Sequence, residues 1–148
     1  MSVLKAFGAY LPARIVPNQE LGRKLNRTPD WILDVSGIEQ RRYAAENESV
    51  ADMAVAAATQ CLERAGMTAA DIGMFIVSSG STERRFPGPA SIVANRLGAS
   101  SAPALDVPMA SAGGLFGIAL AAQLADMYAF LQSIPAPPDA KNIPILNQ

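Results

Sequence analysis

The longest uncharged stretch of the chain, residues 107–125, constrains the fold more than any other feature. It follows a short apolar run of strand type at residues 104–107 and continues as a helix that is apolar on every side. A helix without a polar face has to be covered all round, by a membrane or by the rest of a large core. The glycines, Ser111 and Gln123 within this stretch, and Asp126 directly after it, favour a helix buried in protein. No membrane partner is therefore expected.

Strands and helices alternate along the rest of the chain. The clearest helix covers residues 49–65, where Ser49 and Asp52 form a capping pair, apolar side chains recur every three or four residues, and Gly66 follows. Cys61 lies on its apolar stripe and is expected to pack in the core. The other expected elements are strands at 3–9, 38–43, 74–77 and 104–107, helices at 18–21, 29–36 and 90–97, and an extended tail from about residue 133. This order predicts an α/β sandwich with a central sheet.

The composition excludes several classes of function. The 12 basic and 13 acidic residues nearly cancel, so no nucleic-acid partner is expected. The N-terminus lacks the pattern of a signal peptide, and a single cysteine suits a reducing cytoplasm, where we expect the protein to act. There is no histidine, which excludes a Ser-His-Asp triad, a Cys-His pair and His-ligated zinc from this chain alone. Neither a metal nor a cofactor is expected.

Residues 104–114, ALDVPMASAGG, resemble the nucleophile elbow of the 3-oxoacyl-acyl-carrier-protein synthase III family, which are thiolase-fold condensing enzymes. In that family a buried strand leads into a small-residue turn, and the nucleophile opens a buried central helix. GAYLP at 8–12, DWI at 30–32, SGI at 36–38, RR at 41–42, FP at 86–87 and the helix at 49–66 match in order and spacing. The resemblance implies that residues 1–125 form an incomplete N-terminal half of a thiolase-like layered sandwich. Residues 126–148 would be a helix end and proline-rich tail outside the family.

The resemblance also implies site residues. Ser111 occupies the position of the family's nucleophilic cysteine; the alternative is a serine that caps an ordinary core helix. Trp31 would stack on the adenine of coenzyme A, or else be a half-buried core residue, and Val35 stands where the family has an arginine for the nucleotide end. Phe86 would cross a dimer interface and line the partner's acyl pocket, or else simply pack there.

The differences from the family pattern leave two hypotheses for function. A hydroxyl is a far weaker acid than a thiol and needs a neighbouring base, and the family's catalytic histidine and asparagine belong to a C-terminal repeat without counterpart here. As an enzyme, the chain would transfer acyl groups between acyl-coenzyme A and acyl-carrier protein in fatty-acid or polyketide biosynthesis, as a homodimer or completed by a second-half polypeptide. We expect no condensation by the isolated chain. The alternative is a truncated or degenerate homologue that acts as a binding subunit.

Overall fold

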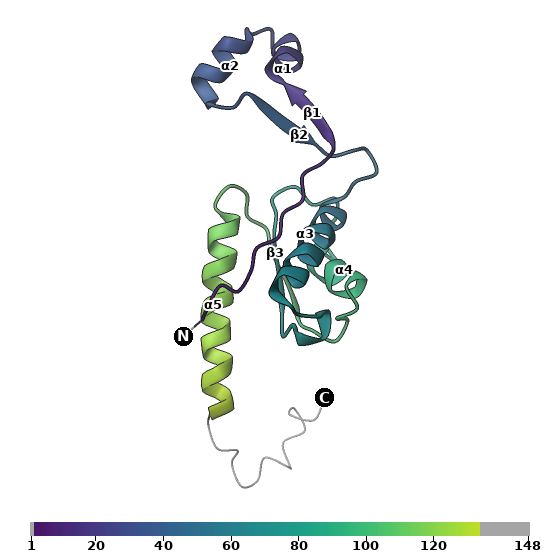
Figure 1. Ribbon diagram of the computed structural model, residues 1–148, viewed down its shortest axis with the longest axis vertical. Coiled ribbons are helices and arrows are strands. Elements are labelled where there is room, and N and C mark those ends of the chain that lie inside the picture. Colours follow the sequence, from purple (N-terminus) through teal and green to yellow (C-terminus); the bar gives the residue numbers. More distant parts are fainter. Residues whose placement is uncertain (1, 134–148) are drawn as a thin grey trace.

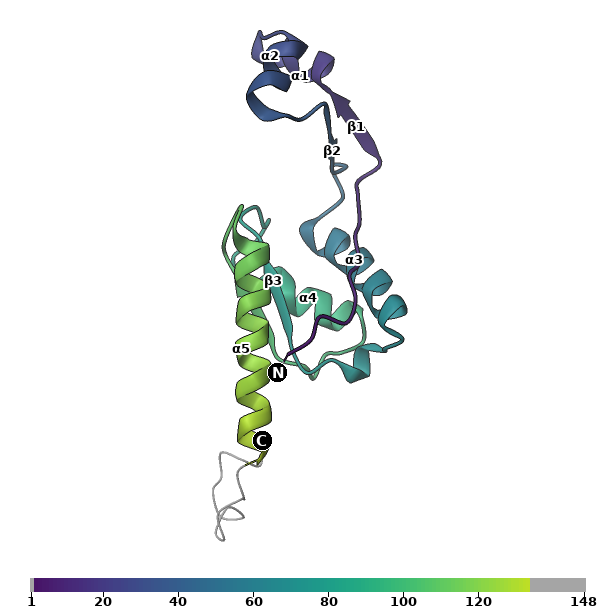
Figure 2. The same cartoon turned by 60° about the vertical axis from the view of Figure 1, so that its left-hand side comes forward.

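The computed structural model describes residues 2–133, which form a body and an arm that projects from one end of it (Figures 1 and 2). The arm contains β1 (Arg14–Pro17), α1 (Asn18–Leu25), α2 (Pro29–Ser36) and β2 (Gln40–Tyr43). The body contains α3 (Val50–Ala65), the short 3-10 helix η1 (Ala69–Asp71), β3 (Phe75–Ser78), α4 (Pro89–Arg96), β4 (Ala104–Val107) and α5 (Gly113–Ser133).

The arm is a two-stranded antiparallel ribbon that carries two short helices. Strand β1 pairs with β2, with Arg14 opposite Tyr43 and Pro17 opposite Gln40. The buried side chain of Asn18 ties the ribbon to the helices, because its amide donates to the Ile38 carbonyl (2.8 Å) and its oxygen accepts from Arg41 (2.8 Å). The polar strand expected at 38–43 is confirmed as β2. Its partner β1 was not expected from the sequence, and helix α1 extends beyond the expected residue 21.

The body is layered, with the sheet between α5 on one side and helices α3 and α4 on the other (Figure 1). Strands β3 and β4 pair in parallel, with Phe75 opposite Ala104 and Ser78 opposite Val107. Both expected strands are confirmed, but they are only half buried, because the sheet has two strands within the described residues. The α/β class with this layering is confirmed.

Helix α3 follows the sequence prediction residue by residue. Ser49 caps it by accepting from the Asp52 N–H (3.1 Å), and Asp52 accepts in return from the Ser49 N–H (2.7 Å). Gly66 ends the helix in the left-handed region, at φ 63°, where a side chain would be strained. The carboxylate of Asp52 also meets Arg96 on α4, so the cap joins the two helices.

The strand expected at residues 3–9 is wrong, because residues 2–13 form no regular element before β1. This segment runs along α3, whose side chains take the place of a neighbouring strand. Gln60 accepts from the Ala9 N–H (3.0 Å), and Arg64 donates to the Phe7 carbonyl (2.9 Å). Gly8 lies against the helix backbone: a Cβ there would be 2.0 Å from the Ala57 carbonyl oxygen.

Helix α5 is only partly covered by the rest of the described residues. Leu115 is 77% exposed, and Phe116, Ile118, Met127, Tyr128 and Phe130 are also exposed. Among the helices and strands only β3 packs extensively against it, and Ser2 of the N-terminal segment donates to the Ala122 carbonyl (3.0 Å). Most of its large apolar side chains remain exposed within residues 2–133. Residues 113–130 have a mean hydropathy of 1.3 and are long and apolar enough to cross a membrane, a test that core helices of soluble proteins also pass.

Candidate active site

Ser111 lies in the tight turn that joins β4 to α5. The turn is closed by a hydrogen bond from the Gly113 N–H to the Ala110 carbonyl (2.8 Å), and α5 begins at Gly113. Ser111 is exposed and makes no hydrogen bond to residues 2–133. The first N–H groups of a helix have no partner within it, and its dipole favours negative charge at that end. Ser111 therefore precedes the N-terminus of α5, the end of a helix at which negative charge is favoured.

Glycine and small residues hold this turn against the end of β3. A Cβ on Gly113 would lie 2.2 Å from the Ser78 hydroxyl, so only glycine fits without moving that side chain. A Cβ on Gly80 would lie 3.1 Å from the Ala110 Cβ, which brings the loop after β3 beside the turn. Gly113 is therefore constrained by its contact with Ser78, whereas a Cβ on Gly114 would meet nothing within 4 Å.

A cleft of about 500 Å³ opens beside this turn, at the carboxyl ends of β3 and β4. Asp106, from β4, lines it and accepts from the Ala90 N–H at the start of α4 (2.8 Å). Gly88 is buried against the same carboxylate, since a Cβ there would lie 2.1 Å from the Asp106 Oδ2. Asp106 therefore caps α4 and is already engaged.

No described residue is positioned to activate Ser111. The groups whose pKa values are shifted lie elsewhere. The hydrogen bond to Glu48 raises the pKa of Tyr10, and hydrogen bonds from Ser49, helped by Arg96, lower the pKa of Asp52 to about 2. Hydrogen bonds from Thr68 lower the pKa of Asp71. Within residues 2–133 no cluster of potential metal ligands is found either. An acyl transfer at Ser111 would need a base from outside this range.

Trp31 lies on α2 of the arm and is 46% exposed. Thr28 caps the helix by accepting from the Trp31 N–H (3.1 Å), and the guanidinium of Arg27 lies 5.2 Å from the centre of the indole ring. Val35, one helical turn after Trp31, is 62% exposed and on the same side of the helix. The arm thus presents the indole ring of Trp31 with the guanidinium of Arg27 over it.

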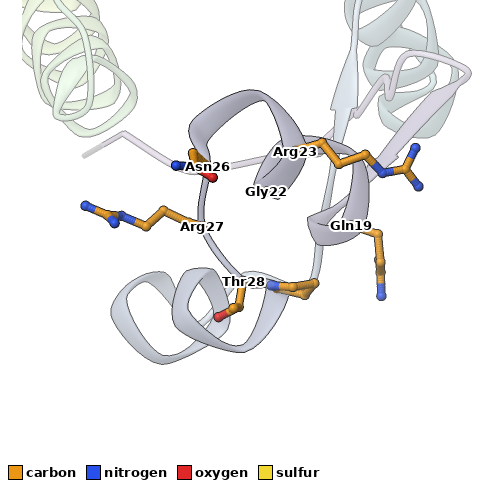
Figure 3. A pocket seen from close by; sticks show the side chains of 7 residues that line it. Gln19, Gly22, Arg23, Asn26, Arg27 and Thr28 are labelled. Carbon is orange, nitrogen blue, oxygen red and sulfur yellow. The ribbon is translucent and has the colours of Figure 1, made fainter.

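A shallow pocket of about 520 Å³ lies at the corner between α1 and α2. Figure 3 shows Arg23 and Arg27 pointing in opposite directions from this corner, so their charges do not converge on one ligand. The sequence reasoning missed Arg27; its signal was a basic residue four positions before the only tryptophan.

Phe86 is 93% exposed, at the end of the loop that lines the cleft beside Ser111. The structure does not bring the three site residues together, because Trp31 lies on the arm while Ser111 and Phe86 belong to the body (Figure 2). The roles expected for Ser111, Trp31 and Phe86 remain predictions. The sequence reasoning also missed two cleft residues, Arg84 and Arg85, although adjacent arginines in a loop of small residues are conspicuous.

Curated proteins with similar sequences carry the name beta-ketoacyl-[acyl-carrier-protein] synthase III. No protein-family model matches the chain. Beta-ketoacyl-[acyl-carrier-protein] synthase III of Listeria welshimeri is 42% identical over 116 residues, which are 78% of this chain and 37% of that protein. The synthase III of Geobacillus kaustophilus is 39% identical over 123 residues, covering 83% of this chain and 40% of its own length.

Solved structures with a similar fold are also ketosynthases. The 3-oxoacyl-[acyl-carrier-protein] synthase III from Aquifex aeolicus superposes with a TM-score of 0.78 at 28% identity, over 83% of this chain and 40% of that one. The priming beta-ketosynthase of the R1128 polyketide pathway gives 0.71 at 34% identity, over 74% and 33%. The chain therefore spans about two fifths of the length of the curated relatives it matches. In sequence and fold the chain matches the N-terminal portion of the beta-ketoacyl-acyl-carrier-protein synthase III family.

Proposed function

We propose that the chain is the acyl-accepting portion of a synthase III-like acyltransferase of fatty-acid or polyketide biosynthesis. Ser111 takes an acyl group from a coenzyme A thioester. The observation that carries the proposal is the exposed, unbonded hydroxyl of Ser111 directly ahead of the first turn of α5. Unpaired N–H groups there can stabilise the negative charge that develops on an attacked carbonyl.

The proposed acyl transfer requires a partner that supplies a base. The Ser111 oxygen attacks the thioester carbonyl, the carbon–sulfur bond breaks, and the serine proton passes through a base to the departing thiol of coenzyme A. The chain contains no histidine. By family resemblance the base is a histidine from the portion that has no counterpart in this chain. A second polypeptide that carries this portion would complete the site, and the acyl group would then pass to an acyl-carrier protein in the cytoplasm.

The arm would hold the nucleotide end of coenzyme A. Trp31 offers an exposed indole face, and Arg27 is close enough to that ring to meet a phosphate or cover the bound adenine. Exposed Val35 supplies no charge on that side, so the affinity should be weak. Phe86, exposed beside the cleft, would line the acyl pocket of a second copy in a homodimer.

A binding subunit without catalysis is the second candidate. The observation that favours it is the absence of any hydrogen-bonding base at Ser111 within residues 2–133. In that case the exposed surface of α5 and the arm would serve only to bind a partner and coenzyme A.

Intact-mass spectrometry after incubation with acetyl-coenzyme A tests the proposal. We expect the isolated chain to remain unacylated and to show no condensation with malonyl-carrier protein. Ser111→Cys should acquire one acetyl group at position 111, because a thiol of ordinary pKa near 8.5 ionises readily beside a helix N-terminus. Exposed Ser101 provides the matched control, and Ser101→Cys should acylate far more slowly.

Two outcomes would contradict the proposal. Equal acylation of Ser111→Cys and Ser101→Cys would show that the turn does not favour attack on a thioester. Turnover by the isolated chain that survives Ser111→Ala would show that the active site lies elsewhere.

A further inference from the structure

The cleft beside Ser111 carries two arginines in its wall. It is lined at one end by the loop after β3, including Ser79, Gly80, Thr82, Arg84 and Arg85, and at the other by β4 and the start of α4. Val77, Val107 and Pro89 give it an apolar floor. Nothing in the proposed transfer of a simple acyl group uses a positive charge at this place.

The charges of the two arginines are not neutralised within residues 2–133. Neither Arg84 nor Arg85 makes an ion pair or hydrogen bond there. The neighbouring Glu83 is directed to α3, where it accepts from the Val50 N–H (3.0 Å). The acid that lines the cleft, Asp106, is held by the Ala90 N–H and the start of α4. The cleft therefore has two free cationic groups and one engaged carboxylate.

This cationic wall lies close to the serine. Pro108 lines the cleft, and three residues of extended chain span at most about 10 Å, which bounds its distance from Ser111. The loop is also anchored to the turn, since Gly80 lies beside Ala110. The cleft therefore opens close to Ser111 along the chain, with both arginines among the residues that line it.

We propose that Arg84 and Arg85 select acyl groups that carry a carboxylate, so that the substrate is the coenzyme A thioester of a short dicarboxylic acid. This inference rests on the proposed function. Guanidinium groups present planar pairs of N–H donors that match a carboxylate. The methylene part of the chain would lie on Val77 and Val107. Both arginines are exposed, so an acyl group without charge leaves them to water, whereas a carboxylate can pair with them.

Isothermal titration calorimetry of the full chain with malonyl-coenzyme A and acetyl-coenzyme A tests the selection, because the two ligands differ only in the carboxylate. We expect malonyl-coenzyme A to bind about tenfold more tightly. Arg84→Gln and Arg85→Gln should each reduce this preference and leave the affinity for acetyl-coenzyme A unchanged. Lys5→Gln, which removes an exposed charge outside the cleft, is the control and should keep the full preference. Circular dichroism confirms that each variant is folded.

A second titration, with malonate alone and with inorganic phosphate, separates failure of this inference from failure of the proposed function. If neither thioester binds but malonate does so in an Arg84-dependent manner, the carboxylate site stands and the coenzyme A proposal falls. Equal affinity for the two thioesters, or a preference that both arginine variants retain, overturns the inference. Binding of phosphate but not malonate also overturns it, because the cleft would then recognise a phosphate group.

Discussion

At the scale of single residues, the proposed function depends on one atom at position 111, the hydroxyl oxygen of the serine. A helix N-terminus contributes roughly 0.3–2 kcal/mol to a nearby negative charge, and one pKa unit corresponds to about 1.4 kcal/mol. A helix N-terminus can therefore lower the pKa of a cysteine by enough to form a useful amount of thiolate. The same effect leaves a serine hydroxyl protonated at neutral pH. The position of Ser111 in the β4–α5 turn was predictable from the sequence. The absence of a bonded base could be established only from the structure.

Position 35 is the second residue on which the proposed function depends. Val35 is 62% exposed, one turn after Trp31 on the same side of α2. We expect Val35→Arg to tighten binding of coenzyme A about tenfold, because an added guanidinium can make charge-assisted bonds to phosphate. Quenching of the fluorescence of Trp31, the only tryptophan, reports the binding.

The matched control for position 35 lies on the same helix. Leu33 is also exposed, two residues from Trp31, and positions two apart do not face each other on a helix. Leu33→Arg should therefore leave the affinity unchanged. An equal gain in coenzyme A affinity in both variants would indicate general electrostatic attraction. Tight binding by the wild type that Val35→Arg does not alter would show that the missing charge at position 35 does not weaken binding.

At the scale of elements, local signals predicted the helices better than the strands. The helix at 49–65 carries its cap and its stop within its own sequence, and α3 matches it. Strand β1 was missed because it contains Arg14 and Pro17, residues that do not mark a strand by themselves. The strand expected at 3–9 has the right composition, but a strand needs a paired neighbour, and here α3 provides the hydrogen bonds.

The cap of α3 should make the free energy of unfolding depend on pH in the acid range. Hydrogen bonds from Ser49, together with Arg96, lower the pKa of Asp52 from 3.8 to about 2. A lowered pKa means that the folded state favours the charged carboxylate. Its contribution is therefore complete above about pH 4 and is lost as the pH falls through about 2. Thermal unfolding midpoints of the wild type and Asp52→Asn, measured by circular dichroism from pH 5 to 2, should converge at the acid end. A constant difference across this range would contradict the assigned cause.

The N-terminal segment should detach from α3 when Gly8 gains a side chain. A Cβ would lie 2.0 Å from the Ala57 carbonyl oxygen and 2.6 Å from the Cys61 nitrogen, both backbone atoms that cannot turn aside. We expect Gly8→Ala to destabilise the protein by about 1–3 kcal/mol. It should also speed alkylation of Cys61, whose thiol lies against the Ala6 carbonyl.

Gly73 gives the control for Gly8, since a Cβ there meets nothing within 4 Å. Gly73→Ala should leave both the unfolding free energy and the alkylation rate of Cys61 close to the wild type. If Gly8→Ala alkylates no faster than Gly73→Ala, the segment is held by contacts other than this close approach.

At the scale of the whole molecule, residues 2–133 leave many apolar side chains of helix α5 exposed. The sequence alone predicted that such a helix needs cover on all sides, and the layered body covers it mainly through β3. The resemblance to an N-terminal half-domain already implied that this cover would be incomplete, and the exposed apolar side chains of α5 agree with it. The matched relatives are about two and a half times as long as the matched region.

The last prediction is that the chain associates with itself in solution. The side chains of Leu115, Phe116 and Ile118 are exposed on one end of α5, and Tyr128 and Phe130 on the other. A patch beyond a few hundred Å² exceeds what monomers usually leave exposed, and at roughly 25 cal/mol per Å² its burial contributes several kcal/mol. Light scattering after size exclusion, at tens of micromolar protein, should give a mass above the 15.5 kDa of one chain.

Substitutions on α5 should distinguish this cause from general stickiness. Replacing Leu115, Phe116 and Ile118 by glutamine should return the mass to that of a monomer, because glutamine keeps the helix propensity while it removes the apolar surface. Leu11 and Leu25 are 68% and 53% exposed outside α5, and their replacement by glutamine should leave the association unchanged. A monodisperse wild-type monomer that unfolds cooperatively would mean that the chain covers α5 by itself. No second portion of the fold would then be needed to hold the helix in water.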